Sequence, residues 1–285
     1  MTDYSYLIDV DELQAQLTQA AWHVVDCRFN LMQPAQGQED YERGHIPGAS
    51  YANLDSDLAG TVSDSSGRHP LPFARQFAAT LSSWGIDNNS QVVVYDGGSG
   101  AIAARLWWML KWVGHDRVAV LNGGFAAWQE AAYEVSDVVE SVTASSFQAQ
   151  PNPDLVISTA DLEDAMHAGN APILVDARDR ARFAGEAEPI DSVAGHVPGA
   201  INHPFSESVD EKGAWKSVQE IRESWSGVLG ADQDRPWVAM CGSGVTACHL
   251  ALSARLAGYC IPALYVGSWS EWIRDPGRPI TIGSE

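Results

Sequence analysis

The sequence predicts an α/β protein of two tandem domains, each built on a mainly parallel sheet that helices flank. Three observations carry this prediction. The same landmarks occur twice in the same order, short apolar runs alternate with amphipathic stretches, and 285 residues suit two domains of ordinary size. Alternating strands and helices with fully apolar strands favour a parallel sheet that is covered on both faces. A composition of 45% hydrophobic and 19% charged residues is that of a folded protein.

The repeat has an offset of roughly 150 residues and points to one duplicated domain. The landmarks of the first copy are residues 24–28, 44–49, 93–100 and 123–128, and those of the second are residues 174–178, 195–200, 238–244 and 267–272. Between the copies, a stretch rich in Ser, Val, Gln, Asn and Pro lacks helical periodicity, as an extended linker does. We predict a non-catalytic domain over residues 1–138, a linker over 139–154 and a catalytic domain over 155–285.

Matched elements can be placed in both copies. Apolar, partly β-branched runs predict buried strands at residues 91–95 and 237–240. Helical stretches follow at residues 103–113 and 245–257. Gly114 and Gly258 stand where glycines end helices in the left-handed conformation. The two copies therefore share a strand, turn and helix unit.

The charge balance limits the classes of partner. Seventeen basic against 37 acidic residues give a formal net charge of −20, which repels nucleic acid and anionic membrane surfaces. An anionic substrate would need local positive charge or backbone amides. The N-terminus lacks the features of a signal peptide, and the most apolar helical stretch, residues 101–113, is interrupted by Arg105 and Lys111. We expect a cytoplasmic protein with no nucleic-acid and no membrane partner.

The candidate nucleophile is Cys241, which follows the strand at 237–240 and opens a glycine-rich turn before a helix. Ligands of open α/β sheets bind at such carboxyl ends, where amides and the helix dipole stabilise negative charge. These features favour a reactive thiolate, although the spacing alone fits an inert buried cysteine equally well. The first copy has Asp96 at the matching position. At most one copy can therefore perform thiol chemistry. The other three cysteines, Cys27, Cys248 and Cys260, are interpreted as structural, and no zinc spacing is present.

The Gly-His-Ile/Val-Pro-Gly-Ala segments, the cysteine loop and the Gly-Ser-Trp-x-x-Trp element together resemble the rhodanese superfamily in its tandem form. The loop from Cys241 to Ala247 resembles that of 3-mercaptopyruvate sulfurtransferases, and it lacks the basic residues typical of thiosulfate sulfurtransferases. The resemblance implies that Cys241 takes sulfur from 3-mercaptopyruvate, releases pyruvate and holds a persulfide. A thiol, thioredoxin or cyanide would then accept the sulfur. It implies no cofactor and no metal.

The resemblance also implies a polar trio of Asp55, His69 and Ser243 that assists the donor's carbonyl group. Arg182 matches one arginine that binds the donor's carboxylate, whereas a second expected arginine falls on Ile190. Arg68 is the candidate replacement. The further residues implied to contact the donor are Gly242, Gly244, Val245 and Thr246.

Three alternatives remain to be weighed. A cysteine phosphatase or arsenate reductase needs an arginine six positions after the cysteine, where this chain has Ala247, and is therefore disfavoured. A thiosulfate sulfurtransferase would use the same cysteine. A non-enzymatic sulfur-carrier or sensing module is disfavoured because only one copy keeps the cysteine, the loop glycines and the serine.

Overall fold

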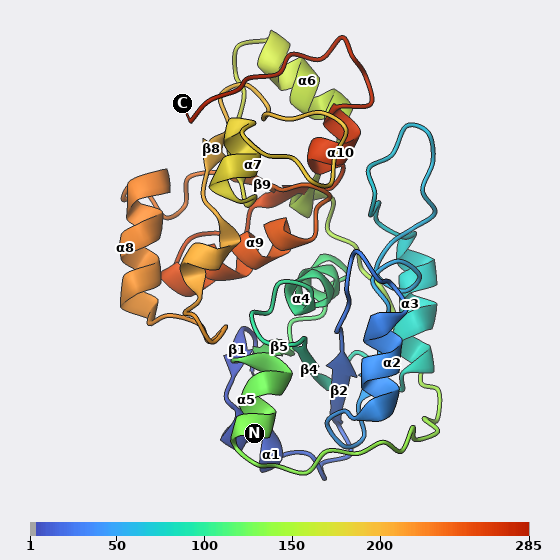
Figure 1. Cartoon of the computed structure of the whole chain (residues 1–285). Helices are drawn as coiled ribbons and strands as arrows, with labels where there is room; N and C mark the ends of the chain where they lie inside the picture. Colours follow the sequence, from blue (N-terminus) through green and yellow to red (C-terminus); the bar gives the residue numbers. More distant parts are fainter. Residues whose placement is uncertain (1–3, 285) are drawn as a thin grey trace. The chain divides into compact units, whose positions relative to one another are not determined.

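The computed structural model describes residues 4–284, which divide into two compact units. The first unit holds the described residues up to Gly60, then Pro72–Asn152 and Val209–Trp215. The second holds Thr61–Leu71, Pro153–Ser208 and the described residues from Lys216 onward. Each unit contains one five-stranded sheet whose strands are all parallel, with helices around it (Figure 1). The predicted α/β class with two tandem, mainly parallel sheets is confirmed.

The two sheets have the same strand order, which is the structural form of the sequence repeat. The first sheet runs β1-β5-β4-β2-β3, and its strands are β1 Leu7–Ile8, β2 Trp22–Asp26, β3 Ser50–Tyr51, β4 Gln91–Tyr95 and β5 Val118–Leu121. Its helices are α1 Val10–Gln14, α2 Gln36–Arg43, α3 Ala74–Ser83, α4 Ala103–Trp112 and α5 Gly124–Glu130.

The second sheet runs β6-β10-β9-β7-β8 in the same pattern. Its strands are β6 Val156–Ile157, β7 Ile173–Asp176, β8 Ile201–Asn202, β9 Trp237–Met240 and β10 Ala263–Tyr265. Its helices are α6 Thr159–His167, α7 Arg180–Ala184, α8 Val218–Leu229, α9 Thr246–Ala257 and α10 Ser268–Trp272, with short 3-10 turns at Pro153–Leu155 and Phe205–Ser208. The strand β9 lies at the centre, with Asp176 of β7 opposite Met240.

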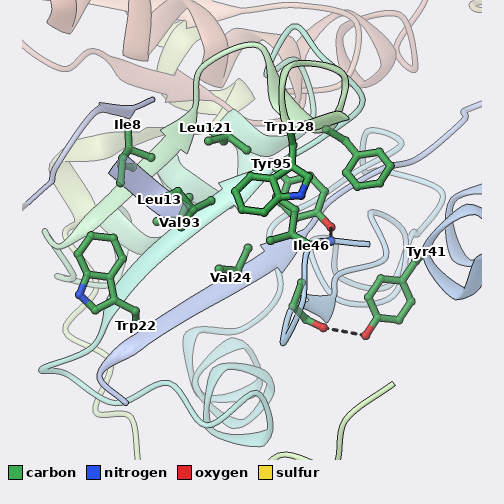
Figure 2. Packing of buried hydrophobic residues seen from close by; sticks show 13 residues of the cluster. Ile8, Leu13, Trp22, Val24, Tyr41, Ile46, Val93, Tyr95, Leu121 and Trp128 are labelled. Carbon is green, nitrogen blue, oxygen red and sulfur yellow. Dashed lines mark hydrogen bonds between the residues drawn. The ribbon is translucent and has the colours of Figure 1, made fainter. Parts of the chain in front are cut away.

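The first core forms where apolar side chains of β2, β4 and β5 meet those of the flanking helices (Figure 2). The Tyr95 hydroxyl accepts a hydrogen bond from Ile46 N and donates to Asp26 Oδ2 at 2.8 Å. The Tyr41 hydroxyl donates to Ala49 O at 2.7 Å. These bonds attach the Gly-His-Ile-Pro-Gly segment to the core, because buried hydroxyl and backbone groups need partners.

Two irregular segments, residues 139–152 and Thr61–Leu71, can be assigned to a unit by their packing. Residues 139–152 lie against the first unit, where Ser145 N donates to Ser82 O and Gln150 N donates to Val113 O. Thr61–Leu71 belongs to the second unit although it precedes α3 in the chain. The boundaries at residues 138 and 155 stay a prediction. Among residues 4–284, no helix combines the length and the apolar character that crossing a bilayer requires.

Candidate active site

Cys241 lies directly after β9 and is held there by the first turn of α10. Its side chain is almost fully buried, at 2% exposure. The Cys241 N–H donates to Ser268 Oγ at 3.1 Å, and its carbonyl accepts from Trp269 N at 3.0 Å. Ser270 N likewise donates to Gly242 O at 2.8 Å. Backbone bonds on both sides therefore fix the position of the cysteine.

The loop curls back so that Gly244 N donates to Cys241 Sγ at 3.1 Å. Gly244 has φ +78°, and a methyl side chain there would lie 2.6 Å from Val266 O. Only glycine fits this position without strain. The helix α9 begins at Thr246, after Val245. The sulfur therefore accepts an amide hydrogen bond in the loop that leads into the N-terminus of α9, and such loops stabilise negative charge.

His69 and Ser243 form a buried pair beside the loop. The distance between His69 Nδ1 and Ser243 Oγ is 2.8 Å, and the two residues are only 4% and 7% exposed. Both belong to the second unit, because residues 61–71 pack there. The structure brings together two members of the predicted trio, 174 positions apart in sequence.

Asp55, the third member, lies in the first unit, and the residue as a whole is exposed. Its N–H donates to Asn53 Oδ1 at 2.9 Å. Partial burial raises the pKa of its carboxyl group. The role of Asp55 in the trio stays a prediction.

Two guanidinium groups, those of Arg68 and Arg182, border the loop at Gly242. A methyl side chain at Gly242 would lie 3.1 Å from Arg68 Nη2 and 3.5 Å from Arg182 Nη2. Asp191 pairs with both arginines, and Glu188 receives hydrogen bonds from Arg182 Nε and Nη2. Burial raises the pKa of Asp191 despite the opposing charge of Arg68. For Glu188, burial also acts to raise the pKa, but the hydrogen bonds from Arg182 and from backbone N–H groups outweigh it and lower the pKa.

The helix α7, which carries Arg182, is fixed by a histidine of the Gly-His-Val-Pro-Gly segment. His196 stacks on Phe183 with ring centroids 3.7 Å apart, and His196 Nδ1 lies 2.8 Å from Phe183 O. Asp179 accepts a hydrogen bond from Ala181 N and caps the helix. His196 is fully buried, so its contacts with Phe183 are structural ones that hold α7 in place.

The main chain that carries Arg68 and His69 is tied to α10. Gly67 N donates to Glu271 Oε2 at 3.2 Å, and Arg68 N donates to Ser270 Oγ at 3.0 Å. The same turn of α10 therefore holds both the cysteine loop and the Arg68 segment.

Four residues of this site were not predicted from the sequence: Glu188, Asp191, Ser270 and Glu271. Ile190, in contrast, is 39% exposed and donates only its backbone N–H to Glu188. The carboxylates beside Ile190 were a usable signal, because an arginine pair needs counter-charges when it is partly buried. Ser270 and Glu271 had no comparable signal. Within residues 4–284, no group of three or more His, Cys, Asp or Glu side chains could hold a metal ion.

The matching loop of the first unit is occupied by its own carboxylate. Asp96 Oδ1 accepts from Gly98 N and Gly100 N, each at 2.9 Å, and Oδ2 accepts from Ile102 N at 2.9 Å and Ala103 N at 3.2 Å. Four backbone amides therefore converge on one negative charge. A carboxylate in this place cannot act as a sulfur nucleophile.

Comparison with known proteins agrees with this geometry. The rhodanese-like domain family matches residues 9–131 and again residues 158–275. A probable 3-mercaptopyruvate sulfurtransferase of Pseudomonas aeruginosa is 43% identical over 97% of this chain and 98% of its own length. A putative thiosulfate sulfurtransferase of Mycobacterium tuberculosis is 35% identical over 92% of this chain and 91% of its own. The crystal structure of a 3-mercaptopyruvate sulfotransferase from Escherichia coli superposes with a TM-score of 0.80 at 32% identity, over 94% of this chain and all of that one. The chain therefore belongs to the rhodanese superfamily, as a tandem-domain sulfurtransferase similar to the 3-mercaptopyruvate sulfurtransferases.

Proposed function

We propose that the chain transfers a sulfur atom from 3-mercaptopyruvate to a thiophilic acceptor through a persulfide on Cys241. One observation carries this proposal: two guanidinium groups border Gly242, the residue next to the buried cysteine. A thiolate and a carboxylate-binding pair side by side suit a donor that carries both a sulfur atom and a carboxylate. The Pseudomonas relative that is named for this donor supports the choice.

The first step forms one S–S bond and breaks one C–S bond. The Cys241 thiolate attacks the sulfur of the donor, and the C–S bonding electrons pass to the carbon chain, which leaves as the enolate of pyruvate and takes up a proton. Ser243 donates a hydrogen bond to the carbonyl oxygen where that charge develops, and His69, 2.8 Å away, orients the hydroxyl. The membership of Asp55 in this polar trio remains part of the proposal.

The second step returns the enzyme to its thiolate form. The acceptor, a thiol, thioredoxin or cyanide, attacks the outer sulfur, and the S–S bonding electrons return to Cys241. The loop from Gly242 to Thr246 surrounds the persulfide. Its anion-binding capacity is supported by the first unit, where the equivalent loop directs four amides at Asp96.

The persulfide is tested by incubating the protein with 3-mercaptopyruvate and measuring its intact mass. We expect an adduct of one sulfur atom that cyanide removes. Cys241→Ser should form none, and the control Cys248→Ser should form it normally, since a serine hydroxyl can make the hydrogen bond that the Cys248 thiol donates to Gly244 O. An adduct that survives in Cys241→Ser would contradict the mechanism.

Thiosulfate is the second candidate donor. It is supported by the Mycobacterium relative, which is named for this donor. Comparing kcat/KM for the two donors in one preparation decides between them. We expect a preference for 3-mercaptopyruvate, because two separate N–H donors match a planar carboxylate. A preference for thiosulfate would overturn this donor assignment.

A cytoplasmic location of the protein also remains part of the proposal.

A further inference from the structure

We propose that Asp191 is a positioning residue that joins Arg68 and Arg182 into one carboxylate-binding cradle and thereby sets the affinity for the donor. This inference rests on the proposed function. It assigns a role to a residue that does not itself contact the reacting atoms.

The bridge is made by the two oxygens of one carboxylate. Asp191 Oδ1 accepts from Arg68 Nη1, and Asp191 Oδ2 accepts from Arg182 Nη2 at 3.1 Å. The Asp191 side chain is 4% exposed, against 25% for Arg68 and 17% for Arg182. The carboxylate therefore lies beneath two guanidinium groups that still reach solvent.

The bridge leaves donor groups available on the side of the loop. Glu188 receives hydrogen bonds from Arg182 Nε and Nη2, so Arg182 Nη1 remains, and a methyl side chain at Gly242 would lie 3.7 Å from it. Asp191 engages Arg68 Nη1, so Arg68 Nη2 remains, 3.1 Å from the same point. Within residues 4–284, neither remaining nitrogen donates a hydrogen bond. One N–H from each arginine can thus meet one oxygen of a bound carboxylate.

Asp191 is needed because the two cations otherwise repel each other. Arg68 is a long side chain on an irregular segment, and holding it beside Arg182 costs rotamer entropy as well as electrostatic energy. A shared carboxylate offsets both costs before the donor arrives. Ile190 supplies no cation, so the second guanidinium group beside Gly242 comes from Arg68, in the segment of residues 61–71.

Asp191→Asn tests the bridge, because asparagine keeps the shape but offers only one acceptor oxygen and no charge. We expect KM for 3-mercaptopyruvate to rise about tenfold while kcat changes less than about twofold. Glu186→Gln is the matched control, since Glu186 is an exposed carboxylate of the same segment. An unchanged KM, or a fall in kcat as large as the rise in KM, would overturn the proposal.

A double-mutant cycle with Arg68→Met tests whether Asp191 acts through Arg68. We expect Arg68→Met to raise KM, and the added Asp191→Asn to raise it little further, because the bridge has already lost one end. Fully multiplicative effects would mean that the two residues act independently, and would overturn the proposal.

Protection by pyruvate gives a readout that does not need turnover. Iodoacetamide is uncharged, so we expect it to alkylate Cys241 at the same rate in wild type and Asp191→Asn. Pyruvate should slow this alkylation in wild type, and about tenfold more pyruvate should be needed in the variant. Equal protection, or altered alkylation without pyruvate, would overturn the proposal. If 3-mercaptopyruvate transferred no sulfur while pyruvate protected Cys241 as expected, the proposed function would be wrong. The proposed role of Asp191 in carboxylate binding would still hold.

Discussion

Glu188 shows how a single carboxylate can stabilise the site by charge. It is 4% exposed and accepts hydrogen bonds from Arg182 Nε and Nη2 and from the N–H groups of Ile190 and Asp191. Its pKa is lowered below the ordinary value of 4.5, although burial alone would raise it. A carboxyl group whose pKa is lower in the folded state stabilises that state above its unfolded pKa, and loses this effect as the pH falls through the folded pKa.

We therefore expect Glu188→Gln to lower the free energy of unfolding by about 2 kcal/mol at pH 7, because the Arg182 guanidinium loses a charged, buried partner. The difference from wild type should shrink as the pH falls below about 4.5, where the unfolded wild-type chain takes up a proton at Glu188, and should be lost once the pH has fallen through the lower pKa of the folded state. Urea titrations at several pH values measure it, with Glu186→Gln as the control. A difference that stays constant from pH 7 to the acid range would contradict this account.

Among the elements, the first turn of α10 organises the site because it binds two segments at once. Trp269 N and Ser270 N hold the carbonyls of Cys241 and Gly242, while Ser270 Oγ holds Arg68 N. The helix α10 has only five residues, yet its first turn sets the position of Cys241 relative to Arg68. The segment that carries Arg68 lies so close to this turn that only a small residue fits opposite it.

Gly67 is that residue, and Gly67→Ala tests the close approach. A methyl group there would lie 2.5 Å from Gly267 O, so the segment of residues 61–71 must shift outward and carry His69 and Arg68 with it. We expect kcat/KM for the sulfur donor to fall at least about tenfold. Gly227→Ala is the control, because nothing lies within 4 Å of its β-carbon position. Normal activity in Gly67→Ala would show that the close packing of residues 61–71 against α10 does not position the site.

At the scale of the whole molecule, the formal net charge of −20 opposes an anionic donor. The two arginines of the cradle act at contact distance, where salt screens little, whereas the surrounding acidic groups act over many ångströms. Ionic strength should therefore separate the two effects.

We expect KM for 3-mercaptopyruvate to fall about two- to threefold as ionic strength rises from about 0.01 to about 0.15 M, because the Debye length shortens from about 30 to about 8 Å. The rate of alkylation of Cys241 by uncharged iodoacetamide should stay constant over the same range. A KM that rises steadily with salt would mean that attraction by the arginines, and not repulsion by the whole molecule, dominates the encounter.

Much of the fold could be predicted because it is written in local patterns. Apolar runs at residues 91–95 and 237–240 became β4 and β9, and Gly114 and Gly258 adopt positive φ where α4 and α9 end. The duplication predicted two matching sheets, and chemistry alone made Cys241, rather than Asp96, the only possible sulfur nucleophile of the two. These conclusions need only periodicity, turn chemistry and the identity of a side chain.

The composition of the site was decided by the tertiary structure. Sequence resemblance indicated His69, Ser243 and Arg182, but the packing of residues 61–71 into the second unit is what brings His69 to Ser243. The carboxylates beside Ile190 signalled counter-charges, but the contact of Asp191 with Arg68, 123 positions away, could not be foreseen, because it depends on how the loops pack. The sequence by itself thus determined the fold and singled out Cys241 as the candidate nucleophile. Tertiary packing decided which charged groups surround Cys241, since partly buried arginines such as Arg68 and Arg182 are stable only beside carboxylates that balance their charge.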